Sequence, residues 1–389
     1  MRILVVTHNY PRFPGDPAGA FVARISAGAA EQGSEVRVVA PHAPGTAEWE
    51  SNGAVEVHRF RYGPDALERV AYTGDLHRKA LLSPLAALSF PAFMLAFKRA
   101  IRSAVKTFAP DVIHAHWWIP GGWLASRMGV PYIVTCHGSD VRLLEKWSGF
   151  RRLALPVLTR AGAITTVSRF LAEDIRHLID RELIQLQVCP MPVDTDHFKT
   201  GQSVQKIEPP RILYAGNLLP SKGVDVLIRA YALLRARGIP CGLRILGEGP
   251  ERSALEERAR SAGHPEIAFS DFLPQDRMPS EYGQSTVTVL PTRGDAEGLG
   301  LTLVEALVAG SAVVGTGAGG IPEVIQHEET GLIAGASAES LADALERIIS
   351  DNALRHRLTT EGQARVVARF STTAAVANFL KLYGDVAHH

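Results

Sequence analysis

Short apolar runs alternate with helical patterns along almost the whole chain. The run RILVVT near the N-terminus precedes a helical pattern at about 21–32, and EVRVVAP, DVIHAH, YIVTCHG and AITTVS continue the alternation. Apolar runs of this length, separated by helices, are typical of strands buried in a parallel sheet with helices on its faces. The first half of the chain therefore predicts a doubly wound α/β domain.

The alternation stops after Phe198 and then starts again. Residues 199–209 are polar and end in proline, which is typical of a linker. A second α/β series follows, with the apolar runs RILYAG, GLRILGEG, IAFSDF, VTVLPT, SAVVGT and GLIAGA. We expect one Rossmann-like domain over residues 1–198, a second over 210–372, and a C-terminal helix at 373–389 that packs back on the first domain.

Composition and charge exclude several classes of protein. The chain has 389 residues, of which 46% are hydrophobic and 21% charged, as in ordinary globular proteins of two domains. The net charge of +1 gives no electrostatic footprint for nucleic acid. Three cysteines far apart indicate neither a disulfide framework nor a metal site, and suit a reducing compartment. With only a short apolar run before His8, no signal peptide is indicated, and we expect a cytoplasmic protein.

Residues 80–97 form the longest apolar stretch. Pro84 and Pro91 interrupt it, and it barely reaches the length that spans a bilayer. Lysines and arginines flank it on both sides. Two interpretations stay open: a buried helix pair that covers the sheet, or a surface that rests peripherally on the inner face of a membrane.

Parallel sheets bind ligands at the carboxyl ends of their strands, so the loops there are candidate sites. In GNLLPSKG, Gly216 allows a tight exit from a strand, and Lys222 precedes a helix N-terminus, which attracts anions. Gly19 precedes the first helix of the chain in a similar way. The four glycines of GTGAGGIPEVI, residues 315–325, suit either close approach to an anion or a tight turn.

The stretch EGLGLTLVEALVAG, residues 297–310, contains two glutamates eight positions apart. Glu297 follows the strand VTVLP in a loop, whereas Glu305 lies one turn into the next helix. The amides of residues 299–301 suit a phosphate, Glu305 suits a vicinal diol such as ribose, and Glu297 faces a group further along the ligand. Diphosphate, diol and a second polyol together describe a nucleotide sugar.

In combination these motifs resemble the retaining glycosyltransferases of family 4, also described as glycosyl transferases group 1. TCHGSDV at 135–141 and PVDTDHF before the linker are similar to that family as well. The resemblance implies the GT-B fold, in which two Rossmann-like domains face an interdomain cleft. It also implies retaining, metal-independent transfer of a hexose from a UDP- or GDP-sugar to an acceptor hydroxyl, with no cofactor. The first domain would bind the acceptor, which is a sugar, a lipid-linked glycan or another small molecule.

The resemblance also implies roles for single residues. His137 would lie beside the transferred sugar, Lys222 would contact the diphosphate, and Glu297 would bind the sugar; these three are the candidate catalytic residues. Glu305 would bind the ribose. The complete donor-binding set is Gly19, Ala20, Gly216, Asn217, Lys222, Glu297, Gly298, Leu299, Gly300, Leu301 and Glu305. Asn217 stands where the family usually has arginine, so one diphosphate contact is expected to be weaker or supplied elsewhere.

Two motifs resemble sites of other protein classes. DTD at 194–196 imitates a metal-binding acidic pair but matches the family segment VDxxxF, so no metal site is expected. GEGPER at 247–252 imitates a dinucleotide fingerprint, with Asp271 as its ribose acid, but Arg252 replaces the third glycine. The alternatives are a GT-B epimerase or hydrolase, an NAD-dependent oxidoreductase, and a non-catalytic nucleotide-sugar-binding protein.

Overall fold

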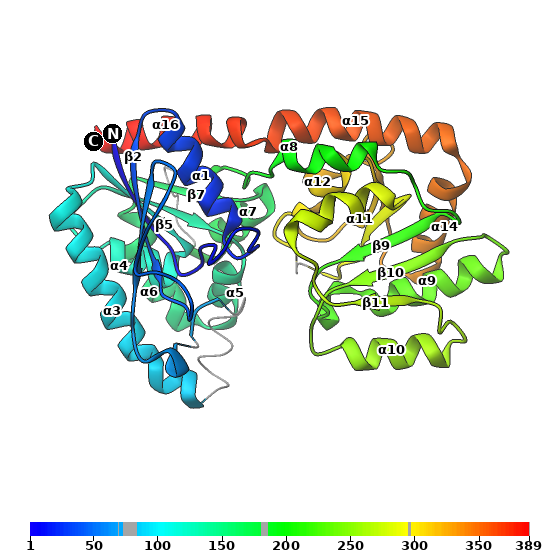
Figure 1. The fold of residues 1–389 in the computed structure, drawn as a ribbon, viewed down its shortest axis with the longest axis horizontal. Coiled ribbons are helices and arrows are strands. Elements are labelled where there is room, and N and C mark those ends of the chain that lie inside the picture. Colours follow the sequence, from blue (N-terminus) through cyan, green and yellow to red (C-terminus); the bar gives the residue numbers. More distant parts are fainter. Residues whose placement is uncertain (69, 73–83, 180–185, 295–296, 389) are drawn as a thin grey trace. The chain divides into compact units, whose positions relative to one another are not determined.

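The structure is a computed structural model that describes residues 1–389 except 69, 73–83, 180–185, 295–296 and 389. The chain forms two compact units (Figure 1). Unit 1 consists of Met1–Pro192 and Thr372–His389, and unit 2 of Val193–Ser371. Each unit is built on a parallel sheet, with one antiparallel edge strand in unit 1, and helices flank it, so the doubly wound α/β class expected from the sequence is confirmed.

Unit 1 contains an eight-stranded sheet in the order β3-β4-β2-β1-β5-β6-β7-β8. All neighbouring strands are parallel except β3 and β4. The strands are β1 (Arg2–Val6), β2 (Glu35–Pro41), β3 (Trp49–Asn52), β4 (Val55–Phe60), β5 (Val112–His116), β6 (Tyr132–Cys136), β7 (Ala163–Thr166) and β8 (Leu186–Val188). The strand order reverses between β1 and β5, which is where doubly wound sheets open a crevice for ligands.

Helices cover both faces of this sheet and fill the crossovers. They are α1 (Ala20–Glu31), η1 (Asp65–Leu67), α3 (Pro84–Phe108), η2 (Trp117–Gly122), α4 (Trp123–Ala125), α5 (Ser139–Lys146), α6 (Ser148–Thr159), α7 (Arg169–Ile179) and α16 (Thr372–Ala387). Helix α16 packs on α1 so closely that a Cβ added at Gly28 would lie 2.4 Å from Cγ2 of Val376. The C-terminal helix therefore completes the core of unit 1.

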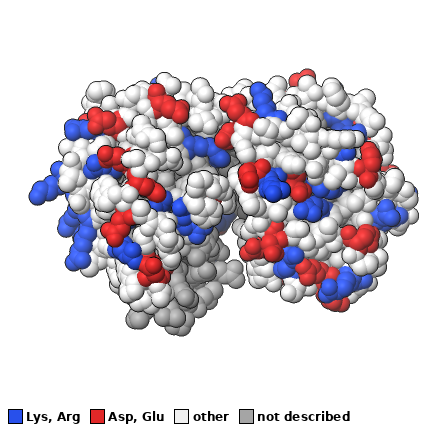
Figure 2. All heavy atoms as spheres, viewed as in Figure 1, with Lys and Arg blue, Asp and Glu red and all other residues white. Residues whose placement is uncertain are grey.

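Helix α3 contains most of the apolar stretch discussed above. It is one helix with Pro91 inside it, not a pair, and residues 80–83 lie outside the described residues. Phe93 and Phe97 are fully buried against Phe60 of β4, whereas Leu95 is 49% exposed. Figure 2 shows lysine and arginine side chains along the edge of unit 1 where α3 runs. Among the described residues, no helix has the length and apolar character that crossing a membrane requires.

Unit 2 contains a six-stranded parallel sheet in the order β11-β10-β9-β12-β13-β14. Its strands are β9 (Arg211–Ala215), β10 (Gly242–Leu246), β11 (Ala268–Ser270), β12 (Val287–Leu290), β13 (Ala312–Thr316) and β14 (Leu332–Ala334). Its helices are α8 (Thr195–Lys199), η3 (Thr200–Ser203), η4 (Pro220–Lys222), α9 (Val224–Ala236), α10 (Arg252–Ser261), η5 (Gln275–Arg277), α11 (Met278–Gln284), α12 (Leu301–Val308), α13 (Ile321–Val324), α14 (Ala338–Ser350) and α15 (Asn352–Phe370). The order reverses between β9 and β12, so the loops after these two strands flank the crevice of unit 2.

Residues 199–209, expected as a linker, are anchored to unit 2. Gln202 donates a hydrogen bond to the carbonyl oxygen of Val308 at 2.8 Å. The ammonium group of Lys206 donates to the carbonyl oxygens of Ser285 at 2.7 Å and Gly310 at 2.6 Å. The polar side chains that made this segment resemble a linker instead satisfy carbonyl groups at loop and helix ends.

Candidate functional site

The loops that follow β9 and β12 pack against each other because these strands are neighbours in the sheet. Gly223 ends the first loop with φ of 66°, and a Cβ there would lie 2.0 Å from the carbonyl oxygen of Pro291. The amide of Arg293 donates to the carbonyl oxygen of Ser221 at 2.8 Å. Only glycine fits at position 223, because both the left-handed backbone and the close approach exclude a side chain.

This packing brings Lys222 and Glu297 together. Nζ of Lys222 lies 2.7 Å from Oε2 of Glu297, and each side chain is 16% exposed. The two residues come from loops 75 positions apart in the sequence. A positive and a negative group, mostly shielded but still in contact with solvent, therefore lie at the reversal point of the sheet.

Two helices begin beside this ion pair without a side-chain cap. The N-cap residues of α9 and α12 are Gly223 and Gly300, both left-handed. By contrast, Ser337 and Asp351 cap α14 and α15 with side-chain oxygens. A glycine cap offers no side-chain acceptor to the first-turn amides, so these helix termini are suited to hold an external anion.

Glu305 lies on α12, and Tyr282 of α11 holds its carboxylate. The Tyr282 hydroxyl donates to Oε2 of Glu305 at 2.9 Å. Burial, and then the negative charge of Glu305, raise the pKa of Tyr282 well above its usual value. The phenol therefore stays protonated and acts as a donor, which fixes the carboxylate in one place. Tyr282 could not be predicted from the sequence, since no motif connects it to the glutamate.

The glycine-rich loop after β13 supports Glu297 through the backbone. The amide of Gly320 donates to the carbonyl oxygen of Glu297 at 3.0 Å. A Cβ added at Gly319 would lie 2.0 Å from the same oxygen. Close packing against the loop that carries Glu297 thus accounts for Gly319 and Gly320.

The GEGPER segment has a similar supporting role for the loop after β9. A Cβ added at Gly247 would lie 1.9 Å from the carbonyl oxygen of Gly216. The amide of Leu218 donates to the carbonyl oxygen of Glu248 at 2.8 Å, and Arg252 donates to that of Gly247 at 3.1 Å. Protein backbone fills the space beside these glycines, which argues against a dinucleotide fingerprint. Asn217, in the supported loop, is exposed.

In unit 1, His137 follows β6 and is enclosed by other rings. Its Nε2 lies 3.0 Å from Nδ1 of His116, at the end of the neighbouring strand β5. Ring centroids of Trp117 and Phe21 lie 4.3 and 4.9 Å from that of His137. Burial, followed by the nearby histidines, lowers the pKa of both His116 and His137 well below the usual value. Both imidazoles are therefore neutral near pH 7.

The backbone beneath His137 is held by Asp140, which belongs to the TCHGSDV motif but was assigned no role from it. Its buried carboxylate accepts hydrogen bonds from the amides of Trp118 at 3.1 Å, His137 at 3.0 Å and Gly138 at 3.1 Å. Burial raises the pKa of Asp140 although these hydrogen bonds act in the opposite direction. Trp117, between the two loops, has φ of 65°, a conformation that is unusual for a bulky residue. An aspartate three positions after a histidine, at a helix start, is the signal that was available.

Gly19 and Ala20 lie where the loop after β1 enters α1. A Cβ added at Gly19 would lie 2.1 Å from the carbonyl oxygen of Asn9, so the loop folds back on itself. Asp16 organises the loop by accepting from the side chain of Arg12 at 2.6 Å and from the amide of Ala18 at 3.1 Å. The predicted site residues thus form two groups, one around His137 and α1 in unit 1 and one around Lys222 in unit 2. A common cleft for both groups stays a prediction.

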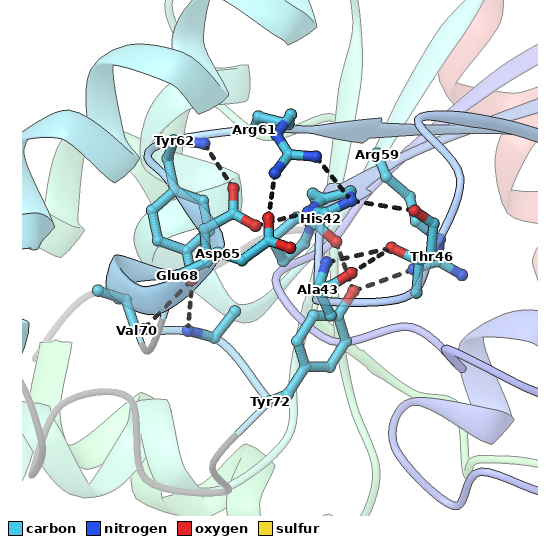
Figure 3. A network of polar contacts seen from close by, with 12 residues as sticks. His42, Ala43, Thr46, Arg59, Arg61, Tyr62, Asp65, Glu68, Val70 and Tyr72 are labelled. Atoms are coloured by element: carbon cyan, nitrogen blue, oxygen red, sulfur yellow. Dashed lines mark hydrogen bonds and ion pairs between the residues drawn. The ribbon is translucent and has the colours of Figure 1, made fainter.

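One further cluster of side chains has the composition of a metal site. The ligand atoms of His42, Asp65 and Glu68 lie within 4.8 Å of one another (Figure 3). However, Nδ1 of His42 already pairs with Glu68 at 2.5 Å, and Nε2 lies 3.0 Å from the carbonyl oxygen of Thr46. Arg61 reaches both His42 and Asp65. With both imidazole nitrogens engaged and a guanidinium among the ligands, the cluster is better explained as an ion-pair network that ties β2 to the loop after β4.

Two family models match the chain side by side. The model described as Glycosyltransferase Family 4 matches residues 18–197, and the one described as Glycosyl transferases group 1 matches residues 197–365. The adjoining matches meet near the start of unit 2 and cover most of both units. They agree with the resemblance drawn from the motifs.

Curated relatives and solved structures match over comparable lengths. A GDP-mannose-dependent alpha-(1-6)-phosphatidylinositol monomannoside mannosyltransferase of Mycobacterium tuberculosis is 28% identical, with 99% of each chain covered. A D-inositol 3-phosphate glycosyltransferase of Acidothermus cellulolyticus is 29% identical over 78% of this chain and 74% of the relative. Sucrose-phosphate synthase from Thermosynechococcus elongatus matches with a TM-score of 0.80 at 20% identity, covering 98% of each chain. Anabaena HepE in complex with UDP and glucose matches with a TM-score of 0.69 at 16% identity and 99% coverage of each chain. The likeness to these structures is one of fold, and it confirms the GT-B class.

Proposed function

This chain belongs to glycosyltransferase family 4, and on that premise we propose that it transfers a hexose from a nucleoside diphosphate sugar to an acceptor hydroxyl with retention of anomeric configuration. The observation that carries the proposal is the Lys222–Glu297 pair, 2.7 Å apart, beside two helix N-termini that have glycine caps. A cation and open amides suit a diphosphate, and a carboxylate at the same place suits a sugar hydroxyl.

In this proposal the residues of unit 2 bind the donor. Lys222 and the first amides of α12 neutralise the charge that grows on the diphosphate as it leaves. Glu305, held by Tyr282 at 2.9 Å, accepts hydrogen bonds from the two ribose hydroxyls. Glu297 accepts from a hydroxyl of the hexose when Lys222 turns to the phosphate.

The chemistry proposed is attack on the face from which the diphosphate departs. The bond from the anomeric carbon to the diphosphate oxygen breaks, the bond to the acceptor oxygen forms, and the acceptor proton moves to the leaving diphosphate. His137, neutral because its partly buried position and the nearby histidines lower its pKa, orients the hexose by a hydrogen bond. Asp140 is not a candidate nucleophile, since three backbone amides already occupy its carboxylate. Lys222 and the helix amides supply the positive charge, so no metal is needed in this scheme.

For the acceptor we propose a lipid-linked polyol or sugar reached from a membrane surface. The Mycobacterium tuberculosis relative acts by name on phosphatidylinositol monomannoside. On α3, Leu95 is exposed between buried phenylalanines, and Arg99, Arg102 and Lys106 are exposed on the same helix. An apolar residue next to several cations suits peripheral contact with anionic lipid. The alternative acceptor is a water-soluble sugar or sugar phosphate, in which case α3 only covers the sheet.

In the decisive experiment, the protein is incubated with GDP-mannose or UDP-glucose in the presence of EDTA, with and without acceptors. Phosphatidylinositol mannosides and inositol phosphates are the first acceptors to include. Acceptor-dependent release of nucleoside diphosphate, with a retained anomer in the product by NMR, supports the proposal. Release without acceptor would indicate a hydrolase, conversion of the donor an epimerase, and binding without turnover a sensor.

A separate flotation experiment with anionic liposomes tests the membrane contact. Binding at low salt that fades at moderate salt, and that the double variant Arg99→Gln/Arg102→Gln lacks, is expected because salt screens surface charge over about 10 Å. Absence of flotation at both salt concentrations contradicts the contact and directs the search to soluble acceptors.

A further inference from the structure

His116 is a buried residue that the proposed reaction does not use. Its Nδ1 lies 3.0 Å from Nε2 of His137, and the two rings stack at 25°. Its Nε2 is buried and bonds no group in the part of the chain that the structure describes. The next histidine along β5, His114, differs in this respect, because Tyr383 and Thr135 occupy its two nitrogens at 2.7 Å each.

Two neutral imidazoles that share one hydrogen bond can arrange the proton in two ways. If His137 donates from Nε2, then His116 must carry its own proton on Nε2, where it meets no acceptor. If His116 donates from Nδ1, its Nε2 is an unprotonated nitrogen that needs no acceptor. Buried N–H groups without an acceptor are rarer in proteins than unused acceptors, which favours the second arrangement.

The second arrangement determines what His137 offers to a ligand. With Nε2 accepting from His116, the proton of His137 lies on Nδ1. No described group bonds that nitrogen, but His137 is only partly buried, so its N–H, unlike one on the buried Nε2 of His116, can reach solvent or a ligand. Trp117 and Phe21 pack against the ring, and Asp140 holds the backbone amide at 3.0 Å, so ring and main chain are both restrained.

We propose that His116 is a positioning residue, which donates its Nδ1–H to His137 and thereby makes His137 an Nδ1–H donor toward an oxygen of the transferred hexose. The role of His137 toward the hexose rests on the glycosyl transfer proposed above. The tautomer itself depends only on the two side chains.

The tautomer is measured by long-range ¹H–¹⁵N correlation NMR on protein labelled with ¹⁵N-histidine. The resonances of His137 are assigned by their loss in His137→Gln. The Nδ1–H pattern is expected in the wild type and in His116→Asn, because the asparagine amide nitrogen can stand where Nδ1 of histidine stood. The pattern is expected to change in His116→Leu, which cannot donate. His114→Asn is the matched control, equally buried but not bonded to His137, and should leave the pattern of His137 unaltered.

Turnover of the same variants links the tautomer to the reaction. His116→Leu should lower kcat roughly tenfold, the factor given by one neutral hydrogen bond at the sugar, with little change in donor KM. His116→Asn should restore kcat, and His116→Leu should add nothing once His137 is alanine.

Two outcomes overturn the inference: an Nε2–H tautomer at His137 in the wild type, or equal kcat and equal NMR patterns in the Asn and Leu variants. If His116→Leu does not fold, the wild-type and His116→Asn spectra decide. Failure of the wild type to turn over any nucleotide sugar would contradict the proposed function instead, and the wild-type spectrum would still decide the tautomer.

Discussion

Replacement of Asp140 by alanine should destabilise unit 1 more than the same replacement of an exposed aspartate does. Its carboxylate is fully buried and joins the loops after β5 and β6 through three backbone amides. In Asp140→Ala the amides of Trp118 and Gly138, both buried, and that of His137 lose their acceptor. Asp140→Asn keeps one oxygen for His137 and Gly138 but turns an NH₂ group toward the amide of Trp118.

The magnitude follows from the number of donors left unsatisfied. Each buried donor without a partner costs about 1–3 kcal/mol, which sums to about 2–6 kcal/mol for the buried amides of Trp118 and Gly138, and the part-buried amide of His137 adds less. Removal of the buried charge, whose desolvation raises the pKa of Asp140, offsets part of this loss. We therefore expect the free energy of unfolding to fall by about 3 kcal/mol for Asp140→Ala and by about half of that for Asp140→Asn.

Urea denaturation followed by tryptophan fluorescence is the suitable assay. All five tryptophans, Trp49, Trp117, Trp118, Trp123 and Trp147, lie in unit 1, so their emission reports on this unit alone. The matched control is Asp111→Ala, since Asp111 is exposed and accepts from the amide of Arg2 at 2.7 Å. It should cost less than about 0.5 kcal/mol. Equal losses for Asp140→Ala and Asp111→Ala would refute the idea that the buried carboxylate anchors the two loops.

Three further predictions concern unit 2. Glu305→Ala should weaken nucleoside diphosphate binding by about 1.5–3 kcal/mol, because a charged acceptor for two hydroxyls is lost; unchanged affinity in calorimetry would remove Glu305 from the ribose role. Asn217→Arg should strengthen the same binding several-fold at low salt without affecting the thermal midpoint, because position 217 is exposed and gains a charge near Lys222; weaker binding would argue against a diphosphate at this loop. Burial lowers the pKa of Lys206 from 10.5 to about 8. Between these values the unfolded chain keeps a proton that the folded chain has lost, so the free energy of unfolding should rise with pH by up to about 3 kcal/mol, and Lys206→Met should abolish that rise.

The strands of both sheets could be predicted from the sequence because most of them are buried on both faces. Such strands are nearly continuous apolar runs, as in β1 and β13, and need no knowledge of their partners. The edge strand β3 has the sequence WESN and is formed only by antiparallel pairing with β4. Its polar composition gives no strand signal. The segment around Lys206 was misjudged for a related reason, because its polar groups bond carbonyls from distant parts of unit 2.

The candidate site residues also divide into those that could be predicted from the sequence and those that could not. Lys222, Glu297 and Glu305 stood out because their residue types lie at motif spacings beside glycines. Tyr282 and Asp140 did not, because what matters about them is which group they hold: a carboxylate 23 positions away for one and three amides for the other. Partners of this kind depend on how elements pack and leave no periodic trace in the sequence.

Strand order explains why the central contact of each residue group, one in unit 1 and one in unit 2, forms at all. Lys222 and Glu297 lie in the loops after β9 and β12, whereas His116 is the last residue of β5 and His137 follows β6. The two strands of each pair are adjacent in their sheet. Because parallel neighbours end at the same edge, the residues that follow them meet even when 75 positions separate them, as for Lys222 and Glu297. Residues that a motif places directly after strands can therefore be predicted to lie close together once the strand order is known. In both units the doubly wound order brings the loops after neighbouring strands together. The residues of these loops could therefore be predicted from the sequence, whereas the side chains that support them could not.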